Sequence, residues 1–390
     1  MKFNRIFLIV CDSMGIGNAK DAKKYNDFGA NTVGHICSIC DGLNIPTLQN
    51  LGFGNLGDFK GVTKTQNPQA YILKLNEASN GKDTMTGHWE MMGLKTEKPF
   101  ITFTDTGFPK EFIDLFEKKT GRKCVGNIAC SGTKILDMYG EHQIKTGDWI
   151  VYTSADSVFQ IAANEDIIPL DHACQIAREI AMDDKWKVGR VIARPYIGTK
   201  KGHFTRTSNR HDYALAPFSK TALDSLKDAG LDVIGVGKIP DIFVDQGITR
   251  KIKTVSNEDG MNKTIELASD NFNGLAFINL VDFDAVYGHR RNAAGYGKAI
   301  EEFDVQLGKL INELKNDDLL MVTADHGNDP TYRGTDHTRE QVPLIIYSKQ
   351  FNEMKVLNDS NSFGIIGSTI CDNFNVKYNG IGSSILELLK

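Results

Sequence analysis

The stretch GKAIEEFDVQLGKLINELK, residues 297–315, is followed almost at once by LLMVT, residues 319–323. In the first part apolar side chains recur at spacings of three and four, which predicts an amphipathic helix with one buried face. These side chains are Ile300, Phe303, Leu307, Leu310 and Leu314. The second part is a short continuous apolar run, as expected of a strand buried on both faces. The run is followed by Asp325 and His326, so polar residues stand directly after the predicted strand.

Other parts of the chain show the same arrangement, in which an apolar run stops at polar residues. The runs are IFLIV at 6–10, IVYTS at 150–154, VIGVG at 233–237, LAFINL at 275–280 and VPLIIYS at 342–348. Strands that alternate with helices form a mostly parallel sheet covered by helices on both faces. We therefore predict an α/β fold, in which ligands bind beyond the carboxyl ends of the strands.

The composition is that of a globular protein without a strong charge. The chain has 390 residues, 41% hydrophobic and 24% charged, with a formal net charge of -4, and this length fits two domains. The charge argues against a nucleic-acid-binding protein, whose binding face is strongly basic. No apolar run reaches the roughly 18 residues of a membrane-spanning helix. The run at 6–10 also lacks the cleavage site of a signal peptide.

The seven cysteines are scattered along the chain, which is typical of reduced thiols in a cytoplasmic protein. The sequence CSIC at 37–40 has the spacing of a redox or zinc motif, but no second pair of this kind occurs. We interpret it as two half-buried thiols on a helix. A cytoplasmic location is the expectation.

The middle of the chain differs from the flanking parts. It holds a predicted helix at 109–119 and the basic stretch GRVIARPYIGTKKGHFTRTSNRHDYA at 189–214, which we interpret as a loop. We predict that residues 98–217 form an α+β cap domain that binds substrate. This cap is inserted into a metal-binding catalytic core of residues 1–97 and 218–390.

Candidate metal ligands are concentrated in three segments. They are Asp12 in VCDS, Asp284 and His289 in VDFDAVYGHR, and Asp325, His326 and His337 in TADHGNDPTYRGTDHTRE. Mixed carboxylate and imidazole ligands suit first-row divalent metals such as Mn, Fe or Zn. Six ligands are too many for one catalytic ion that keeps an open position. Two ions could share them and clamp the oxygens of a phosphoryl group. A single Asp after a strand is more often a helix cap, so this prediction depends on the six residues occurring together.

The segment GKDTMTG, residues 81–87, raises the question of a phosphate site. It is not a phosphate-binding loop, because Asn76 stands where such a loop needs glycine and Asp83 separates the lysine from the hydroxyl. A threonine hydroxyl is a poor nucleophile unless a base or a metal activates it. Beside two divalent ions, Thr84 could accept a phosphoryl group while Lys82 neutralises its charge. Taken alone, Thr84 would be read as a helix cap.

Four segments together resemble the motifs of the phosphopentomutases, which are members of the alkaline phosphatase superfamily. The segments are VCDSMGIG, GKDTMTGHWEMMG, NLVDFDAVYGHRR and TADHGNDPTYRGTDHTRE. YTSADSVFQIAA, GRVIARP and FTRTSNRHDYAL resemble the cap segments of that family. The likeness extends over almost the whole chain, with no departure at a motif position. It implies an alkaline-phosphatase-like core with an inserted cap.

The resemblance also implies the roles of the site residues. Thr84 is then the residue that becomes phosphorylated. One metal ion would be held by Asp284, His289 and His337, and the other by Asp12, Asp325 and His326. Manganese is the usual ion of the family. The implied reaction interconverts ribose 1-phosphate and ribose 5-phosphate, and the deoxyribose pair, through a 1,5-bisphosphate. A sugar bisphosphate primes it, in nucleoside salvage and breakdown.

The phosphate far from the metals needs cationic groups that accept either end of the bisphosphate. Arg194, Arg206 and Lys238 are candidates, since a guanidinium binds phosphate through two parallel hydrogen bonds. Ser154 and Asp156 could hydrogen-bond the sugar hydroxyls. A solvated basic loop is the alternative interpretation of the arginines. The expected partners are small pentose phosphates, and a monomer is expected because no exposed apolar stripe stands out in the sequence.

Three other classes of protein could share some of these features. A metal-dependent phosphohydrolase or sulfatase would use the same core but release the group to water. A sulfatase would carry a cysteine or serine in place of Thr84, and a cofactor-independent phosphoglycerate mutase would use a serine nucleophile and different cap motifs. A non-catalytic binding protein would not need all six ligands and the threonine.

Overall fold

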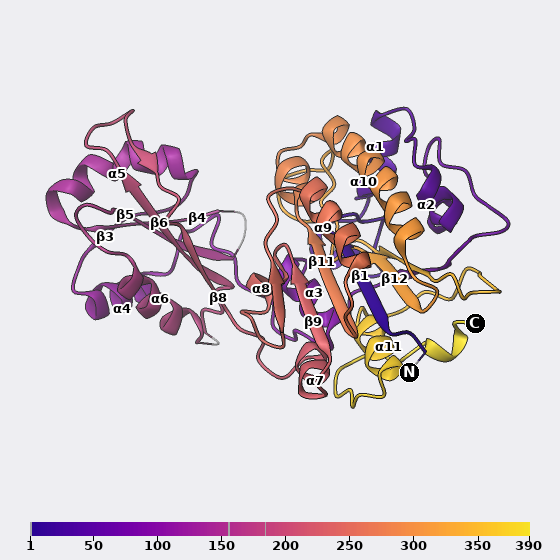
Figure 1. Cartoon of the computed structure of the whole chain (residues 1–390). Coiled ribbons are helices and arrows are strands. Elements are labelled where there is room, and N and C mark those ends of the chain that lie inside the picture. The colour runs from indigo at the N-terminus through magenta and orange to yellow at the C-terminus, as the bar shows by residue number, and fades with distance from the viewer. Residues whose placement is uncertain (1, 155–156, 184) are drawn as a thin grey trace. The chain divides into compact units, whose positions relative to one another are not determined.

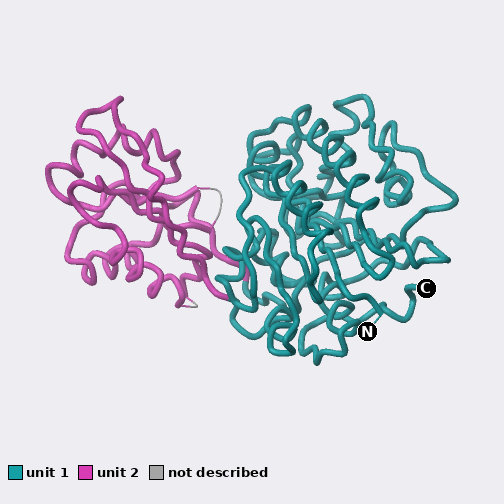
Figure 2. The backbone as a smooth tube through the Cα atoms, in the orientation of Figure 1, with its two compact units in different colours: residues 1–98, 217–390 teal, residues 99–216 magenta. Residues whose placement is uncertain are grey.

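The alternating apolar runs and helices build two separate β-sheets, each with its own helices. The computed structural model describes residues 2–154, 157–183 and 185–390. Two compact units are present, shown in different colours in Figure 2: unit 1 consists of residues 1–98 and 217–390, and unit 2 of residues 99–216. In the described part of the chain, no helix combines the length and apolar character that crossing a bilayer requires.

Unit 1 is built on a seven-stranded sheet with the order β10-β9-β11-β1-β12-β13-β2. The five strands from β10 to β12 are mutually parallel, whereas β13 is antiparallel to both β12 and β2. The predicted α/β fold with a mostly parallel sheet is therefore confirmed. The strands are β1 (Arg5–Cys11), β2 (Tyr71–Leu75), β9 (Asp232–Val236), β10 (Arg250–Ile252), β11 (Gly274–Leu280), β12 (Asp318–Thr323) and β13 (Val342–Tyr347).

The helices of unit 1 form two groups, which Figure 1 shows on either side of the sheet. α10 packs with α1, α2 and α9, whereas α11 packs with α3 and α7. The α-helices are α1 (Thr32–Ile39), α2 (Pro46–Leu51), α3 (Thr84–Met91), α7 (Ala222–Asp228), α8 (Ile239–Ile242), α9 (Asn257–Ser269), α10 (Ala293–Glu313) and α11 (Ile365–Asn373). Shorter helices are η1 (Ala22–Tyr25), η2 (Phe53–Leu56), the π-helix η3 (Phe283–Gly288) and η4 (Leu386–Leu388).

The helix predicted at 297–315 is the longer part of α10. It begins after Asn292, whose side chain accepts a hydrogen bond from the Gly295 backbone N–H, as a helix cap does. The apolar positions expected to face the core are buried, among them Ile300, Phe303 and Leu307. Burial of this face, at about 25 cal/mol per Å² of apolar surface, holds the helix against unit 1.

Strand β1 lies at the centre of the sheet between β11 and β12. Cys11, its last residue, is paired with Leu280 of β11, and Val10 is paired with Thr323 of β12. Because the three strands are parallel and end together, the residues that follow them gather at one edge of the sheet. Asp12 and Asp325 lie at this edge, and so does the π-helix η3.

Unit 2 has a mixed six-stranded sheet with the order β3-β4-β5-β6-β7, in which β8 also pairs with β6. β3 is parallel to β4 and β5 is parallel to β6, while β4–β5, β6–β7 and β6–β8 are antiparallel. The strands are β3 (Cys124–Ala129), β4 (Trp149–Thr153), β5 (Val158–Asn164), β6 (Arg190–Ile197), β7 (Thr205–Arg206) and β8 (His211–Ala214). The helices are α4 (Lys110–Thr120), α5 (Gly132–Thr146) and α6 (Asp171–Ala181).

The interpretation of residues 189–214 as a loop is wrong, because most of this stretch forms β6, β7 and β8. Side chains alternate between the two faces of a strand. In β6, Val191 and Ala193 enter the core beside α4 and α6, while Arg190 and Arg194 line a cavity on the other face. The arginines made the segment look like a solvated loop, although Arg190 and Arg194 stand four residues apart, on one face of β6.

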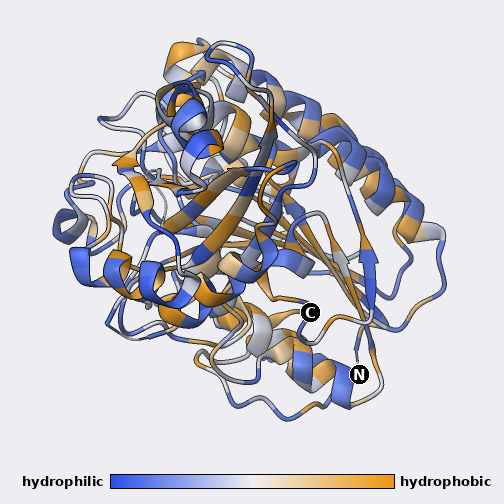
Figure 3. Ribbon diagram, turned by 90° about the vertical axis from the view of Figure 1, so that its left-hand side faces the viewer, coloured by the Kyte–Doolittle hydropathy of each residue, from blue (hydrophilic) through white to orange (hydrophobic). Residues whose placement is uncertain are grey.

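The core of unit 2 is rich in aromatic rings. Phe159 of β5 lies against three phenylalanines, with ring centroids 4.7 Å from Phe108, 4.9 Å from Phe112 and 5.3 Å from Phe116. Figure 3 shows apolar residues concentrated along the strands and the inward faces of the helices. The sheet and α4 are therefore held together mainly by burial of aromatic surface.

Replacing Phe159 by alanine should destabilise unit 2 by about 3–5 kcal/mol, because a fully buried ring is lost and a cavity remains. Tryptophan fluorescence during urea unfolding can measure this, since Trp149 and Trp186 both lie in unit 2. Met182→Ala, at a side chain that is 60% exposed, is the control and should change the stability by less than about 0.5 kcal/mol. Equal effects of the two substitutions would contradict this account of the core.

Candidate metal centre

The first group of candidate ligands lies at the carboxyl ends of β1 and β12. It consists of Asp12, Asp325 and His326, whose ligand atoms all lie within 4.8 Å of one another. Nε2 of His326 is 3.5 Å from Oδ1 of Asp12 and 3.2 Å from Oδ2 of Asp325. All three residues are buried. These are the same three residues that the family resemblance assigns to one ion.

The second group consists of Asp284, His326 and His337, again with ligand atoms within 4.8 Å of one another. Asp284 belongs to the π-helix η3, which follows β11. His326 belongs to both groups, whereas the family resemblance assigns His289 to this ion, and that assignment stays a prediction. His289 lies beside the group, with Nε2 3.1 Å from Oδ2 of Asp284 and its ring centroid 4.8 Å from that of His337.

The buried carboxylates fit a cation. Oδ1 of Asp12 and Oδ2 of Asp325 are buried and accept no hydrogen bond from any described residue, and a buried charge without a partner is costly. Burial raises the pKa of Asp12 well above its usual range, and the neighbouring Asp325 and Asp284 raise it further. A divalent ion that accepts these oxygens as ligands would remove both costs.

Thr84 is the first residue of α3 and lies at the edge of this site. Its Oγ1 is 3.1 Å from Nε2 of His326. The helix is capped by Asp83, whose side chain accepts a hydrogen bond from the Thr86 backbone N–H. The N-terminus of a helix favours negative charge, so a phosphate on Thr84 would be stabilised by α3 as well as by cations.

Lys82 is held between two carboxylates. Its Nζ lies 3.0 Å from Oδ2 of Asp27 and 3.0 Å from Oδ2 of Asp336, the neighbour of His337. The same Asp27 oxygen accepts a hydrogen bond from the Arg339 backbone N–H. The lysine ammonium is therefore fixed next to the ligand segment, although its charge is shared with these acids.

Arg339 supports the loop before Thr84 and was not identified from the sequence. Its guanidinium is 2% exposed in the folded chain and donates to the backbone carbonyls of Glu77, Ser79 and Gly81. It also pairs with the Glu77 carboxylate and with Asp21. No motif pointed to this role, because an arginine in TDHTRE gives no sign of which backbone it will contact.

Two asparagines hydrogen-bond candidate metal ligands, and no motif in the sequence pointed to this role. Asn279, on β11, donates to Oδ2 of Asp12 at 2.9 Å, and Asn328 donates to Oδ1 of Asp284 at 2.7 Å. Arg291 in turn donates to Oδ1 of Asn328 at 3.0 Å. Outer hydrogen bonds of this kind orient the ligands of a metal site.

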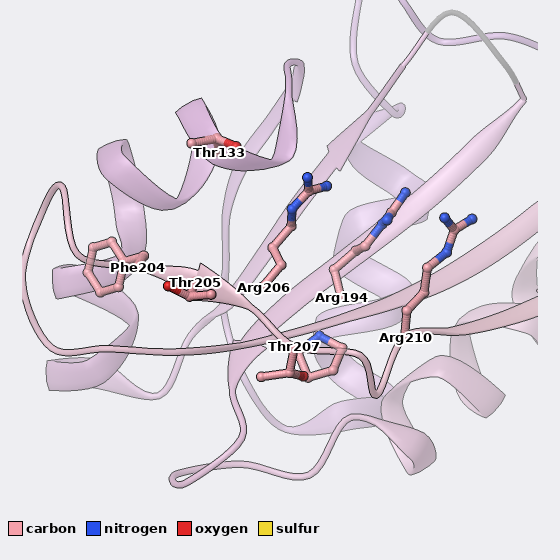
Figure 4. Close-up of a pocket in the computed structure, with 8 residues that line it drawn as sticks. Thr133, Arg194, Phe204, Thr205, Arg206, Thr207 and Arg210 are labelled. Carbon is pink, nitrogen blue, oxygen red and sulfur yellow. The ribbon is translucent and has the colours of Figure 1, made fainter. Parts of the chain in front are cut away.

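In unit 2 the predicted Arg194 and Arg206 lie together with Arg210. They line a cavity of about 600 Å³ and a smaller one of about 260 Å³ that Ser154 also lines. Figure 4 shows the three guanidinium groups side by side and extending in the same direction. Nε of Arg194 donates to Gln160 at 3.0 Å, and Arg210 makes two hydrogen bonds to Asp212. The charge of this cluster suits an anion such as phosphate.

The other two predicted substrate-binding residues are not part of this cluster. Lys238 belongs to unit 1, where it precedes α8 and lies 3.6 Å from Asp241. Asp156 lies outside the described residues.

The sequence matches a family model described as the metalloenzyme superfamily over residues 4–378. Curated phosphopentomutases of Clostridium tetani and Clostridium beijerinckii are each 58% identical to it, and the matches cover 100% of this chain and 99% of each relative. Membership of a metalloenzyme family agrees with the two ligand groups, which account for divalent metal binding.

Among solved structures, a phosphoglycerate mutase of Leishmania mexicana matches with a TM-score of 0.51 at 11% identity, over 99% of this chain and 98% of that chain. A protein of Pyrococcus horikoshii matches with a TM-score of 0.51 at 12% identity, over 98% and 100%. These two likenesses concern the fold alone. The identity and coverage of the curated relatives show that the chain belongs to the metalloenzyme superfamily and, within it, to the phosphopentomutases.

Proposed function

We propose that this chain is a phosphopentomutase that works through phosphorylated Thr84. The observation that carries the proposal is the position of Thr84, with its hydroxyl 3.1 Å from Nε2 of His326 at the start of a helix. The full-length identity with curated phosphopentomutases supports the substrate class, (deoxy)ribose 1-phosphate and 5-phosphate.

The proposed reaction consists of two phosphoryl transfers. In the first, the free hydroxyl of a pentose monophosphate attacks phosphorus on phosphothreonine. The bond from phosphorus to Oγ1 of Thr84 breaks, Oγ1 takes up the proton that the hydroxyl loses, and a 1,5-bisphosphate forms. In the second, the reoriented bisphosphate gives its other phosphoryl group back to Thr84. The monophosphate that leaves is the isomer of the one that entered, and phosphothreonine is restored.

The residues of unit 1 supply positioning and charge. We propose two Mn²⁺ ions, one held by Asp12, Asp325 and His326, the other by Asp284, His337 and His289 or the shared His326. Divalent ions bound there would favour the deprotonated threonine hydroxyl and would neutralise the phosphoryl oxygens. Lys82 adds positive charge from a fixed position. A sugar bisphosphate would phosphorylate Thr84 in a new enzyme molecule.

The residues of unit 2 are proposed to bind the phosphate that is not being transferred. Arg194 and Arg206 offer planar donors that match phosphate oxygens in pairs, and Ser154 lines the same cavity. Arg210 is a further member of this group that the sequence did not single out. Lys238 and Asp156 remain predictions from the sequence.

Asn in place of Asp12 should remove one of two bound metal ions, because the first group loses its carboxylate while the second keeps Asp284 and His337. Metal content after dialysis against Mn²⁺, and calorimetric titration, would measure this. The affinity of the first group for Mn²⁺ should fall by more than about 10-fold. Loss of a residue that only hydrogen-bonds a ligand already lowers metal affinity by about 10–100-fold.

The matched control for this prediction is Asp282→Asn, two residues before Asp284, where the carboxylate hydrogen-bonds the Asn257 backbone. This variant should keep the metal content of the wild type. An Asp12→Asn variant that still held two tightly bound ions would contradict the assignment of Asp12.

Thr84→Ala should abolish the conversion of ribose 1-phosphate to ribose 5-phosphate, because no residue remains to carry the phosphoryl group. The measurement is a coupled assay with Mn²⁺ and a sugar bisphosphate, in which free phosphate is followed at the same time. Thr84→Ser keeps a hydroxyl and should retain activity. Release of free phosphate by the wild type in place of isomerisation would mean a phosphohydrolase instead.

Arg206→Gln should raise KM for ribose 5-phosphate by about 10–100-fold, because a hydrogen bond to a charged group is worth about 1.5–3 kcal/mol. The metal content should not change. Lys200→Gln is the control, since this exposed lysine of the same segment does not line the cavity. An unchanged KM for the Arg206 variant would show that the arginine cluster does not bind substrate.

A further inference from the structure

His88 lies one turn after Thr84 on α3, and its ring is fully buried. Its Nδ1 is 2.8 Å from the backbone carbonyl oxygen of Thr84 and 3.3 Å from Oδ2 of Asp325. The carbonyl oxygen only accepts hydrogen bonds, so Nδ1 carries a proton. The ring of Phe277 lies over the imidazole at an interplanar angle of 28°, with centroids 5.8 Å apart.

The other ring nitrogen faces Asn279. Nδ2 of Asn279 lies 2.9 Å from Oδ2 of Asp12 and 3.3 Å from Nε2 of His88. Asp12 holds a metal ion only as an ionised carboxylate. A carboxylate does not donate, so in this form of the site the amide presents its nitrogen to Asp12, and the second N–H of the same nitrogen can reach only an unprotonated Nε2. A rotated amide would place its oxygen against the carboxylate. The two contacts therefore determine both the amide orientation and the histidine tautomer.

We propose that His88, as the Nδ1–H tautomer, is a positioning residue that ties the backbone of Thr84 to Asp12 through Asn279. The hydrogen bonds run from the Thr84 carbonyl to His88, then to Asn279, and then to Asp12. This inference rests on the proposed function, because it concerns the placement of Thr84 as nucleophile. A displacement of about 1 Å at a reacting group can cost about 100-fold in rate, so such a tie affects catalysis without contact to substrate.

His88→Asn and His88→Gln each preserve one half of the connection. The asparagine amide lies near the position of Nδ1 and can reach the Thr84 carbonyl, whereas the glutamine amide lies near Nε2 and can reach Asn279. Both variants should lower kcat by about 10–100-fold and leave KM nearly unchanged, because neither group touches substrate. Full activity of either variant would show that the unbroken connection is not needed.

Asn279→Leu breaks the same connection at its other member. The double variant His88→Gln/Asn279→Leu should lose no more activity than the worse of the two single variants, since each already interrupts the chain of hydrogen bonds. If the fold-loss of activity in the double variant equalled the product of the two single losses, the two residues would act independently, and the proposal would be overturned.

Thr264→Val separates positioning from stability. Thr264 is a buried residue of α9 whose hydroxyl donates to the carbonyl of Gly260, four residues earlier, at 2.7 Å. Its loss removes a similar bond from a helix without a ligand and should lower Tm while kcat is kept. If the His88 variants likewise lowered Tm with an unchanged kcat, their role would be structural only.

The tautomer can be observed directly in the full chain labelled with ¹⁵N-histidine. The ring signals that disappear in His88→Gln belong to His88. They should show a protonated Nδ1 and an unprotonated Nε2 in the wild type. The Nε2–H tautomer would overturn the inference.

Intact-mass measurement after incubation with a pentose 1,5-bisphosphate separates this inference from the proposed function. If the wild-type protein gains no phosphoryl group, the proposed role of Thr84 is refuted, and so is the positioning role of His88. Wild-type protein that gains one, while the His88 variants gain it equally fast, would refute only the inference. Slower phosphorylation of both His88 variants is the expected result.

Discussion

The organisation of unit 1 depends on placing three acidic side chains in one buried site. Asp12, Asp284 and Asp325 are 1%, 6% and 0% exposed, and water cannot screen their mutual repulsion. Histidines surround them, but two carboxylate oxygens accept no hydrogen bond from any described residue. A bound cation would offset the negative charge of these side chains. The hydroxyl of Thr84, 3.1 Å from Nε2 of His326, would then lie beside that cation.

The surroundings of these acids are correspondingly rigid. They follow three adjacent strands of one parallel sheet, so their spacing is set by backbone hydrogen bonds and not by flexible loops. Arg339 ties the loop before Thr84 through several backbone carbonyls. Such buried charge networks are costly to break by removing one member. The site is therefore held by two systems, the sheet behind the ligands and the polar contacts around them.

The sequence predicted those features that follow from local pattern. Apolar runs and the spacing of Ile300, Phe303 and Leu307 identified strands and a helix, and acids placed after strands identified the edge where the structure brings them together. The roles of Asn279 and Arg339 were not predicted, because they depend on hydrogen-bond partners that lie hundreds of residues away in the sequence. The strands at 189–214 were not predicted, because the arginines on one face made the alternation of apolar residues on the other face hard to recognise.

Unit 2 is one continuous segment, whereas the sheet of unit 1 is assembled from both ends of the chain. This has a consequence for the order of folding during synthesis. Residues 99–216 are complete while β1 still lacks both neighbours, since β11 begins only at Gly274 and β12 at Asp318. Domains generally fold as units as they emerge, and long-range pairing is slow. The later segment can thus fold first, leaving the apolar β1 in need of protection until the last third of the chain is made.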